Sequence, residues 1–480
     1  MIFSKLKKKN SAIPVTVKAS TAYIVCTIFQ KCLSFITLPL FTRLLTKEQY
    51  GQYTIYSSWS GILTMFLTLN LAYGSFSKAM IKFEDKRDEY IASIQGICML
   101  LSAIFLVIYL PFSRWWNKLF ELPTPLMIVM VADILTQTAI LLWSGKKRFE
   151  FKYLSVVLLT VITSIIGPLA AYILVKNSSE KGYARIIGYS GTFIIAGCVI
   201  FIYNMIKGKH LYNKQFWKFA FGFNVPLLIH YLSQVIFNQS DRIMISHLTG
   251  KGDAAMYGVA YNLAMILTFV LNAINNSYVP WFYCKIKEGN QHENKSVSCV
   301  IAVLMALLLL FIIWFAPEII LVMAGKNYSD AIWAVAPVAM SLLLLFYSQL
   351  FINVEFYYES KGNLVWASIG SAVVNVILNY LLIPIFGFIV AGYTTLLSYV
   401  IFVLCNLIAF KKVLKEENMK DDMYDYKGLF LILAAFFVIG FAGVFLYHLL
   451  FVRIIIAIIV LILLLINKNK IIDCLKVIRE

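Results

Sequence analysis

The chain has 480 residues, of which 61% are hydrophobic and 14% are charged. This composition excludes an ordinary soluble domain, because such a domain carries more charge and less apolar surface. The formal net charge of +18 could suggest a nucleic-acid partner. The basic residues nevertheless gather in short clusters between apolar runs, which is typical of cytoplasmic loops, and no nucleic-acid partner is expected.

The apolar runs predict a multi-pass membrane protein with fourteen helical spans. About 20 apolar residues cross the hydrocarbon core as a helix. The first run is too long for a signal-peptide core and no small-residue cleavage pattern follows it, so we expect a retained anchor. In chain order the predicted spans are 19–41, 54–76, 91–111, 124–143, 154–175, 185–206, 219–240, 257–280, 299–316, 331–353, 364–385, 388–410, 429–449 and 452–466.

The distribution of basic residues predicts the orientation of these spans. With the N-terminus in the cytoplasm, the inside segments hold 30 of the 42 Lys and Arg, the outer loops with the span ends beside them hold 11, and Lys31 lies within the first span. We therefore expect both termini in the cytoplasm. The loops are too short for a soluble catalytic domain and the chain has no Gly-x-x-x-x-Gly-Lys-Ser/Thr motif, so we expect neither an enzyme nor an ATP-driven pump.

A repeated motif predicts two related halves. "RLLTKEQYGQYTIY" (Arg43–Tyr56) follows the first span, and "SHLTGKGDAAMYGVAYNLA" (Ser246–Ala264) follows the seventh. Both pass from leucine and threonine through a polar turn to tyrosine-glycine and a helix. The prediction is an all-α fold with two six-helix lobes around a central cavity, a recurring transporter plan. The lobes comprise residues 1–210 and 211–412, and residues 413–480 add a cytoplasmic loop, a terminal helix pair and a short basic tail.

Polar side chains at helical spacing indicate which helices line the cavity. They occur on the first two helices of each predicted half, whereas the last two spans are almost entirely apolar. The alternative is hydrogen bonding between helices. The candidate substrate-binding residues are Tyr23, Lys31, Lys78, Gln234, Asn238, Arg242, Tyr261 and Asn272.

Lys31 is the most informative of these residues. An ammonium near the middle of a span costs several kcal/mol unless it meets water, a counter-ion or an anionic ligand. Two interpretations stay open, namely contact with substrate and a structural ion pair with Asp133. Asp241 and Arg242 lie near the outer end of their span, and there the alternative is an interfacial salt bridge.

Three residues are candidates for ion coupling. Asp133, followed one turn later by Gln137, could bind a proton or sodium, and Asp241 is a second acid near a span end. Histidine is the side chain whose ordinary pKa lies near neutral pH, so His230 could serve in proton coupling, although a hydrogen bond within the bundle is the alternative. No metal site or organic cofactor is predicted, because the eight cysteines form no CxxC pair. Coupling to a proton or sodium gradient is a hypothesis.

Two stretches carry a family resemblance: "LPLFTRLLTKEQYGQYTIYSS" (Leu38–Ser58) and the segment Asn224–Ala264. The sequence resembles the oligosaccharide flippases of the multidrug/oligosaccharidyl-lipid/polysaccharide exporter superfamily. The resemblance implies a bacterial inner-membrane protein that flips undecaprenyl-diphosphate-linked oligosaccharide repeat units by alternating access. The implied process is the biosynthesis of surface polysaccharide, either lipopolysaccharide or capsule. The implied partners are that lipid-linked oligosaccharide, membrane lipids and other polysaccharide assembly proteins.

Alternative functions stay open within and outside this superfamily. A flippase for the lipid-linked peptidoglycan precursor or a drug exporter would share the architecture, although drug exporters tend to place acids in the cavity. A membrane-embedded polysaccharide polymerase or glycosyltransferase is an alternative of another class. Polymerases usually need a large outer loop. The nearest acidic cluster for a transferase, "KDDMYD" (Lys420–Asp425), lies in a lysine-rich loop and is expected to be a solvated face.

The first prediction concerns Lys31. Lys31→Ala should abolish transport while the protein still folds, because the positive charge that meets the anionic substrate is lost. Lys31→Arg should keep part of the activity. Transport by cells that carry each variant, normalised to the amount of folded protein, measures the effect. Normal transport by Lys31→Ala would show that the side chain has a structural role only.

Overall fold

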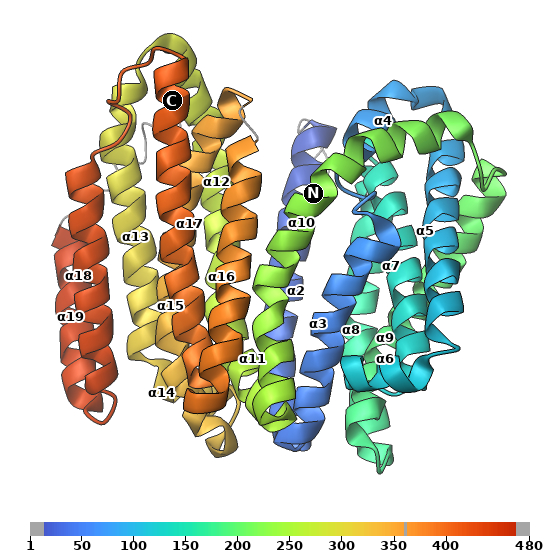
Figure 1. The fold of residues 1–480 in the computed structure, drawn as a ribbon, viewed down its shortest axis with the longest axis horizontal. Coiled ribbons are helices and arrows are strands. Elements are labelled where there is room, and N and C mark those ends of the chain that lie inside the picture. The colour runs from blue at the N-terminus through green and yellow to red at the C-terminus, as the bar shows by residue number, and fades with distance from the viewer. Residues whose placement is uncertain (1–13, 360–361, 467–480) are drawn as a thin grey trace, which may run out of the picture. The chain divides into compact units, whose positions relative to one another are not determined.

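The computed structural model describes residues 14–359 and 362–466, which form α-helices and short 3-10 helices without a β-strand (Figure 1). The predicted all-helical class is confirmed. The chain divides into two compact units, residues 1–239 and 240–480. This division falls inside one long helix, whereas the predicted lobe boundary at 210/211 lies just before that helix.

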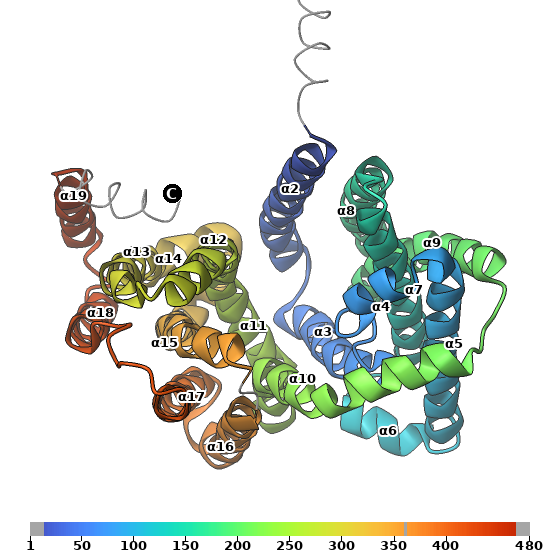
Figure 2. The same cartoon turned by 90° about the horizontal axis from the view of Figure 1, so that it is seen from above.

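The N-terminal unit holds the helices that precede this division, and Figure 2 shows them from above. They are α2 (Val15–Leu44), α3 (Lys47–Thr68), α4 (Phe76–Lys82), η1 (Glu84–Lys86), α5 (Arg87–Tyr109), α6 (Ser113–Phe120), α7 (Thr124–Phe149), α8 (Tyr153–Asn177), α9 (Lys181–Gly208) and the first part of α10 (Lys214–Thr249).

The C-terminal unit begins within α10 and contains the remaining helices. They are α11 (Lys251–Met265), α12 (Leu267–Glu288), η2 (Gln291–Glu293), α13 (Asn294–Trp314), α14 (Ala316–Met323), η3 (Lys326–Ala331), α15 (Ile332–Tyr357), α16 (Gly362–Phe386), α17 (Ile389–Glu416), α18 (Tyr426–Phe445) and α19 (Leu450–Ile466).

Many of these helices have the length and composition of membrane spans. Within residues 14–359 and 362–466, eleven helices are long and apolar enough to cross a membrane, or up to twelve if the bent α10 counts as one span. The two other predicted spans overlap α3, in part, and α19, which is a shorter apolar helix. A multi-pass membrane protein is therefore confirmed. The count of fourteen spans and the location of the termini stay predictions.

Helix α3 begins and ends earlier than its predicted span. The Thr46 hydroxyl accepts a hydrogen bond from the Gln49 backbone N–H, and the Gln49 side chain accepts one from Thr46. This capping box starts the helix at Lys47. Leu69 and Asn70 adopt the left-handed conformation, with φ of 47° and 54°, and this conformation ends it. The chain then turns into the separate helix α4.

Close backbone contacts fix α9 against its neighbours in the N-terminal unit. A Cβ atom on Gly197 would lie 2.6 Å from the backbone oxygen of Thr136 in α7. A Cβ on Gly188 would lie 2.7 Å from the backbone nitrogen of Ala171 in α8. Small residues allow such approach where helices pack without a hydrophobic driving force between them. The contacts bring the middle of α9 next to the middle of α7, where Asp133 lies.

Helix α10 is sharply bent. Its segments Lys214–Pro226 and Tyr231–Thr249 meet at 58°. Proline removes a backbone donor and clashes with the preceding turn, so Pro226 explains a kink here. Pro226 is one of the two prolines, with Pro39, that the sequence marks as helix-bending positions. A role for either proline in rocking the helices stays a prediction.

An ion pair joins the apolar helix α19 to α14 in the C-terminal unit. Arg453 of α19 is 1% exposed and binds both carboxylate oxygens of Glu318 in α14, at 2.8 and 2.7 Å. Its guanidinium also donates to the backbone oxygen of Tyr447 at 2.9 Å. A two-pronged arginine–carboxylate pair is strong and directional. It therefore holds α19 to α14 although the helix is otherwise apolar.

The second prediction tests the close contact of α7 and α9. Gly197→Ala should lower the free energy of unfolding by about 1–3 kcal/mol, because the added methyl group overlaps backbone atoms that cannot move aside cheaply. Gly191→Ala in the same helix is the matched control, since no atom lies within 4 Å of its added Cβ. Thermal unfolding of the purified variants measures the difference. Equal stability of the two variants would contradict the packing described here.

Candidate functional site

A buried carboxylate connects three helices of the N-terminal unit. Asp133 of α7 is 4% exposed. One of its oxygens accepts a hydrogen bond from Gln137 Nε2 at 2.8 Å, and the other accepts one from Ser190 Oγ of α9 at 2.8 Å. The Tyr56 hydroxyl of α3 lies 3.2 Å from the same Ser190 oxygen. Both carboxylate oxygens are thus satisfied inside the bundle, as a buried charge requires.

A second buried carboxylate lies in the C-terminal unit with more donors around it. Asp241 is 1% exposed. It accepts hydrogen bonds from the hydroxyl of Tyr257 at 2.6 Å, from Oγ1 of Thr395 at 2.7 Å and from Nδ2 of Asn379 at 2.6 Å. The three donors come from α11, α17 and α16. The carboxylate therefore joins four helices at one point.

Further oxygen atoms surround Asp241. Asn379 accepts a hydrogen bond from Thr394, and Asn375 accepts one from Asn379 at 3.3 Å. The cluster thus combines one carboxylate with amide and hydroxyl oxygens. Such oxygens are the ligands that hard cations prefer. In the part of the chain that the structure describes, no three His, Cys, Asp or Glu residues form a metal-binding group.

The structure brings the predicted pair Arg242 and Tyr261 together. The guanidinium carbon of Arg242 lies 4.2 Å from the centre of the Tyr261 ring, and both side chains are buried. A cation over an aromatic face is attracted by its quadrupole. Since Arg242 follows Asp241 in the chain and Tyr261 follows Tyr257 by one turn, four charged or aromatic residues form one cluster in the C-terminal unit.

Three other predicted residues of spans 7 and 8 are less buried than this cluster. Gln234 and Asn238 lie on the part of α10 that belongs to the N-terminal unit, and both are half-buried. Asn238 donates to the backbone oxygen of Gln234 at 2.8 Å. Asn272 is exposed on α12. His230 lies in α10, but its side chain is outside the described part of the structure.

Lys31 is exposed on α2. The structural pair with Asp133 is not formed, because both oxygens of Asp133 bind Gln137 and Ser190 instead. Among the described residues no carboxylate lies within 4 Å of the Lys31 ammonium. On the same helix, the ring of Tyr23 lies 5.0 Å from the guanidinium of Arg148 in α7. The Lys31 side chain is thus exposed and has no acidic partner among the described residues, whereas the Tyr23 ring already contacts a cation.

Lys78 lies outside the long helices. It is exposed on the short helix α4, and its ammonium lies 4.8 Å from the centre of the Phe223 ring of α10. The reason for its position is the turn after Thr68, which ends α3 before the predicted span is complete. Lys78 therefore belongs to a contact between α4 and α10 at one end of the N-terminal unit.

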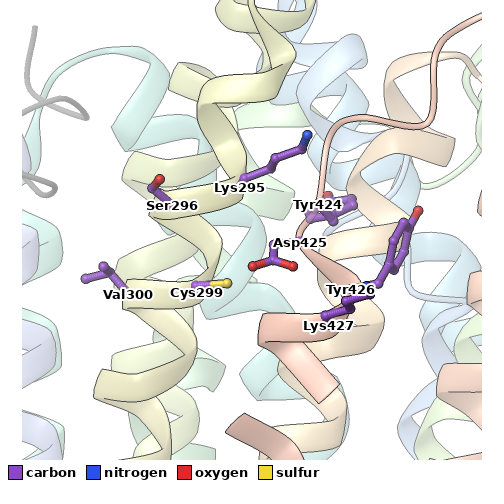
Figure 3. Close-up of a pocket in the computed structure, with 8 residues that line it drawn as sticks. All are labelled: Lys295, Ser296, Cys299, Val300, Tyr424, Asp425, Tyr426 and Lys427. Atoms are coloured by element: carbon purple, nitrogen blue, oxygen red, sulfur yellow. The ribbon is translucent and has the colours of Figure 1, made fainter. Parts of the chain in front are cut away.

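Each aspartate of the acidic loop Lys420–Asp425 accepts a hydrogen bond that gives it a structural role. Asp425 accepts a hydrogen bond from the Gly428 backbone N–H and so caps α18, Asp422 accepts one from Gln291, and Asp421 accepts one from Tyr426. Asp425 also borders a pocket of about 670 Å³ beside α13. Figure 3 shows its carboxylate directed towards Cys299, while Lys295 and Tyr426 flank the opening.

The sequence analysis did not identify several residues that carry a buried charge or contact one. Arg185 of α9 is 7% exposed, and its guanidinium lies 4.6 Å from the ring centre of Phe41, 4.3 Å from that of Tyr50 and 3.6 Å from that of Tyr53. Asn379 and Thr395 were also missed. The repeated tyrosine-glycine motif could have pointed to Arg185, since Tyr50 belongs to that motif, as Tyr257 does in the C-terminal unit. The polar residues of α16 and α17 gave no such signal.

These features define an all-helical, multi-pass membrane protein with buried carboxylates and exposed cations on its helices. The sequence profile of a family described as polysaccharide biosynthesis protein matches residues 16–284, which is more than half of the chain. The chain belongs to this family. The resemblance to lipid-linked and polysaccharide flippases is therefore confirmed.

Relatives and solved structures agree with this assignment. The chain is 22% identical over 372 residues to a protein of the Lsg locus of Haemophilus influenzae, a match that covers 75% of this chain and 89% of that protein. It is 21% identical over 390 residues to an uncharacterized membrane protein of the same organism, covering 75% and 88%.

The fold is that of known transporters. It matches the lipid II flippase MurJ in an inward closed conformation with a TM-score of 0.69 at 15% identity, covering 94% of this chain and 99% of that one. It also matches an inward-facing multidrug resistance MATE family transporter of the MOP superfamily with a TM-score of 0.62 at 13% identity, covering 83% and 99%. At these identities the likeness establishes the fold alone.

Proposed function

We propose that this protein moves undecaprenyl-diphosphate-linked oligosaccharide repeat units from the cytoplasmic to the outer face of the bacterial inner membrane. Its role would be transport rather than catalysis, in the assembly of a surface polysaccharide. Membership of the polysaccharide biosynthesis family supports the substrate class. The fold of a protein named as a lipid II flippase supports the kind of movement.

The observation that carries the proposal is that Lys31 is exposed and has no acidic partner among the described residues. Its ammonium is exposed on a predicted membrane span, and both carboxylate oxygens of Asp133, the acid that could have neutralised it, bind Gln137 and Ser190 instead. A diphosphate carries at least two negative charges, and its transfer through hydrocarbon is prohibitively costly without compensating charge. An exposed cation on α2 supplies such charge through charge-assisted hydrogen bonds. A substrate with a cationic head group would be repelled at this position.

We further propose that the Asp241 cluster binds the coupling cation, a proton or sodium. The support is chemical: a buried carboxylate is surrounded by the oxygens of Asn375, Asn379, Thr394 and Thr395. A sodium ion would take the place of the donors that now satisfy Asp241, whereas a proton would neutralise it directly. In either case the helices α10, α11, α16 and α17 would pack differently in the loaded and unloaded states. Asp133 has fewer oxygens around it, so it is the weaker candidate.

The third prediction tests the function in the native host. Depletion of the protein should trap undecaprenyl-linked repeat units at the cytoplasmic face of the membrane and reduce surface polysaccharide. Drug susceptibility should stay unchanged, apart from effects of the altered surface. Extraction of lipid-linked sugars before and after treatment of inverted vesicles with a glycosidase measures the trapped pool. Normal polysaccharide with increased drug susceptibility would favour an exporter, and accumulation of the peptidoglycan precursor would favour the other flippase.

The fourth prediction concerns the Asp241 cluster. Asp241→Asn should lower gradient-driven transport by about tenfold or more, because it removes the negative charge of the cluster while it keeps the size of the side chain. Asp253→Asn, in the first turn of α11, is the matched control and should leave transport near normal. Uptake of a labelled lipid-linked oligosaccharide into inverted vesicles, with and without a proton or sodium gradient, measures the effect. A gradient response in Asp241→Asn equal to that of the native protein would contradict the assignment.

A further inference from the structure

A pocket of about 470 Å³ lies between α4 and the first part of α10 in the N-terminal unit. Its position is fixed by local contacts. The backbone N–H of Ser75, just before α4, donates to Asn224 Oδ1 of α10 at 2.9 Å. Figures 1 and 2 both show α4 beside this part of α10. The residues that line the pocket are Lys82, Phe83, Gln215, Lys218, Phe219, Gly222 and Phe223.

The floor of the pocket is aromatic and firmly packed. The ring of Phe83 meets the ring of Phe216 edge-on with 4.9 Å between centres, and that of Phe219 with 5.5 Å. Phe83 and Phe216 belong to the buried core that joins α4, α5, α7 and α10. Edge-to-face pairs of this kind hold rings in fixed orientations. The pocket is therefore a built feature and not a gap between loose side chains.

Lysines stand over this aromatic floor. The Lys82 ammonium lies 4.9 Å from the ring centre of Phe219 and 5.6 Å from that of Phe83. The Lys78 ammonium lies 4.8 Å from the ring centre of Phe223. Lys218 lines the same pocket. Three positive charges thus converge on one small apolar surface.

None of these three lysines has an acidic partner among the residues that the structure describes. Two acids close to Lys82 in sequence bind other cations, since Glu84 pairs with Arg87 at 3.2 Å and Asp88 pairs with Lys146 at 2.5 Å. The three ammonium groups therefore give the pocket a positive electrostatic potential that attracts an anion.

Glu150, just after α7, is a third acid that interacts with lysines outside the pocket. Burial raises the pKa of its carboxyl, but a hydrogen bond from Lys152 and the charges of Lys146 and Lys147 hold that pKa below the ordinary value for glutamate. Glu150 is thus committed to the lysines of its own cluster. It does not neutralise the pocket between α4 and α10.

We propose that this pocket is a loading site that binds the diphosphate and first isoprenyl units of the lipid-linked substrate before it moves across the membrane. The inference rests on the proposed function. Ammonium groups bind phosphate oxygens, and phenylalanine rings provide an apolar surface for a prenyl chain. Both flanking segments, 77–90 and 207–218, are loops that the distribution of basic residues predicts to be cytoplasmic. The proposed function also starts from that side of the membrane.

The charge and size of the pocket favour a prenyl diphosphate over an ordinary anionic phospholipid. A phosphodiester such as phosphatidylglycerol brings one negative charge to three unpaired ammonium groups, whereas a diphosphate diester brings two. The volume of about 470 Å³ accommodates a diphosphate with a short length of prenyl chain. The sugars would remain in water, so the site would accept different repeat units on the same carrier.

A binding experiment on the purified full-length protein tests this inference, with farnesyl diphosphate as the probe. The double variant Lys82→Gln/Lys218→Gln should bind the probe about tenfold more weakly than the native protein, because two charge-assisted contacts are lost. The matched control is Lys207→Gln/Lys209→Gln, which changes two exposed lysines of the same predicted loop that do not line the pocket. The control should bind as the native protein does. Equal affinity of the two double variants would overturn the proposal.

Two further probes identify the ligand. The native protein should bind farnesyl diphosphate more tightly than farnesyl monophosphate. Nanodiscs that contain phosphatidylglycerol should not displace the diphosphate at equal lipid phosphate. Equal affinity for the two farnesyl compounds, or complete displacement by phosphatidylglycerol, would overturn the diphosphate assignment and make the pocket a site for bulk anionic lipid.

Transport in inverted vesicles separates this inference from the proposed function. The Lys82→Gln/Lys218→Gln variant should show a raised KM for lipid-linked oligosaccharide with kcat nearly unchanged. An unchanged KM in a variant that does transport would overturn the loading role. Failure of the native protein to move this substrate at all would instead refute the proposed function, whereas the farnesyl diphosphate measurement would still report on the pocket.

Discussion

The cost of an ionised side chain in apolar surroundings governs where charges occur in this structure. Such a charge needs hydrogen-bond donors, a counter-ion or water. Asp133 and Asp241 are buried, and each carboxylate is met by donors from neighbouring helices. Lys31 and Lys82 are exposed, and neither has an acidic partner within the described residues. Acids therefore join helices, while these lysines stay available for an anion.

The different surroundings of the acids and the lysines support different roles for them along the proposed transport path. Lysines over the aromatic floor between α4 and α10 would first take up a diphosphate, and Lys31 on α2 would compensate its charge further on. The Asp241 cluster, far from these residues in sequence, would sense a cation instead. Because its ligands come from four helices, loading it would alter how those helices pack, which is how a bound ion biases a conformational equilibrium.

The sequence predicted the helices well but not the contacts between them. Apolar length was sufficient for the class and for eleven of the predicted spans among the described residues, or twelve with the bent α10. The end of α3 was misplaced because Leu69 and Asn70 continue the apolar pattern while their backbone is left-handed. The Thr46–Gln49 capping box was visible in the sequence and marks the true start. Asn379 and Thr395 could not be predicted, since they lie 138 and 154 residues from Asp241.

The most direct test is the chemical accessibility of position 31. In a variant whose eight native cysteines are replaced by alanine, Lys31→Cys should react with a charged, membrane-impermeant thiol reagent, and undecaprenyl diphosphate should slow that reaction. Ile195→Cys, on the exposed apolar surface of α9, should react only with a lipid-soluble reagent. A position 31 that resists the charged reagent, or that reacts equally fast with and without the prenyl diphosphate, would contradict a hydrated path for an anionic lipid head group.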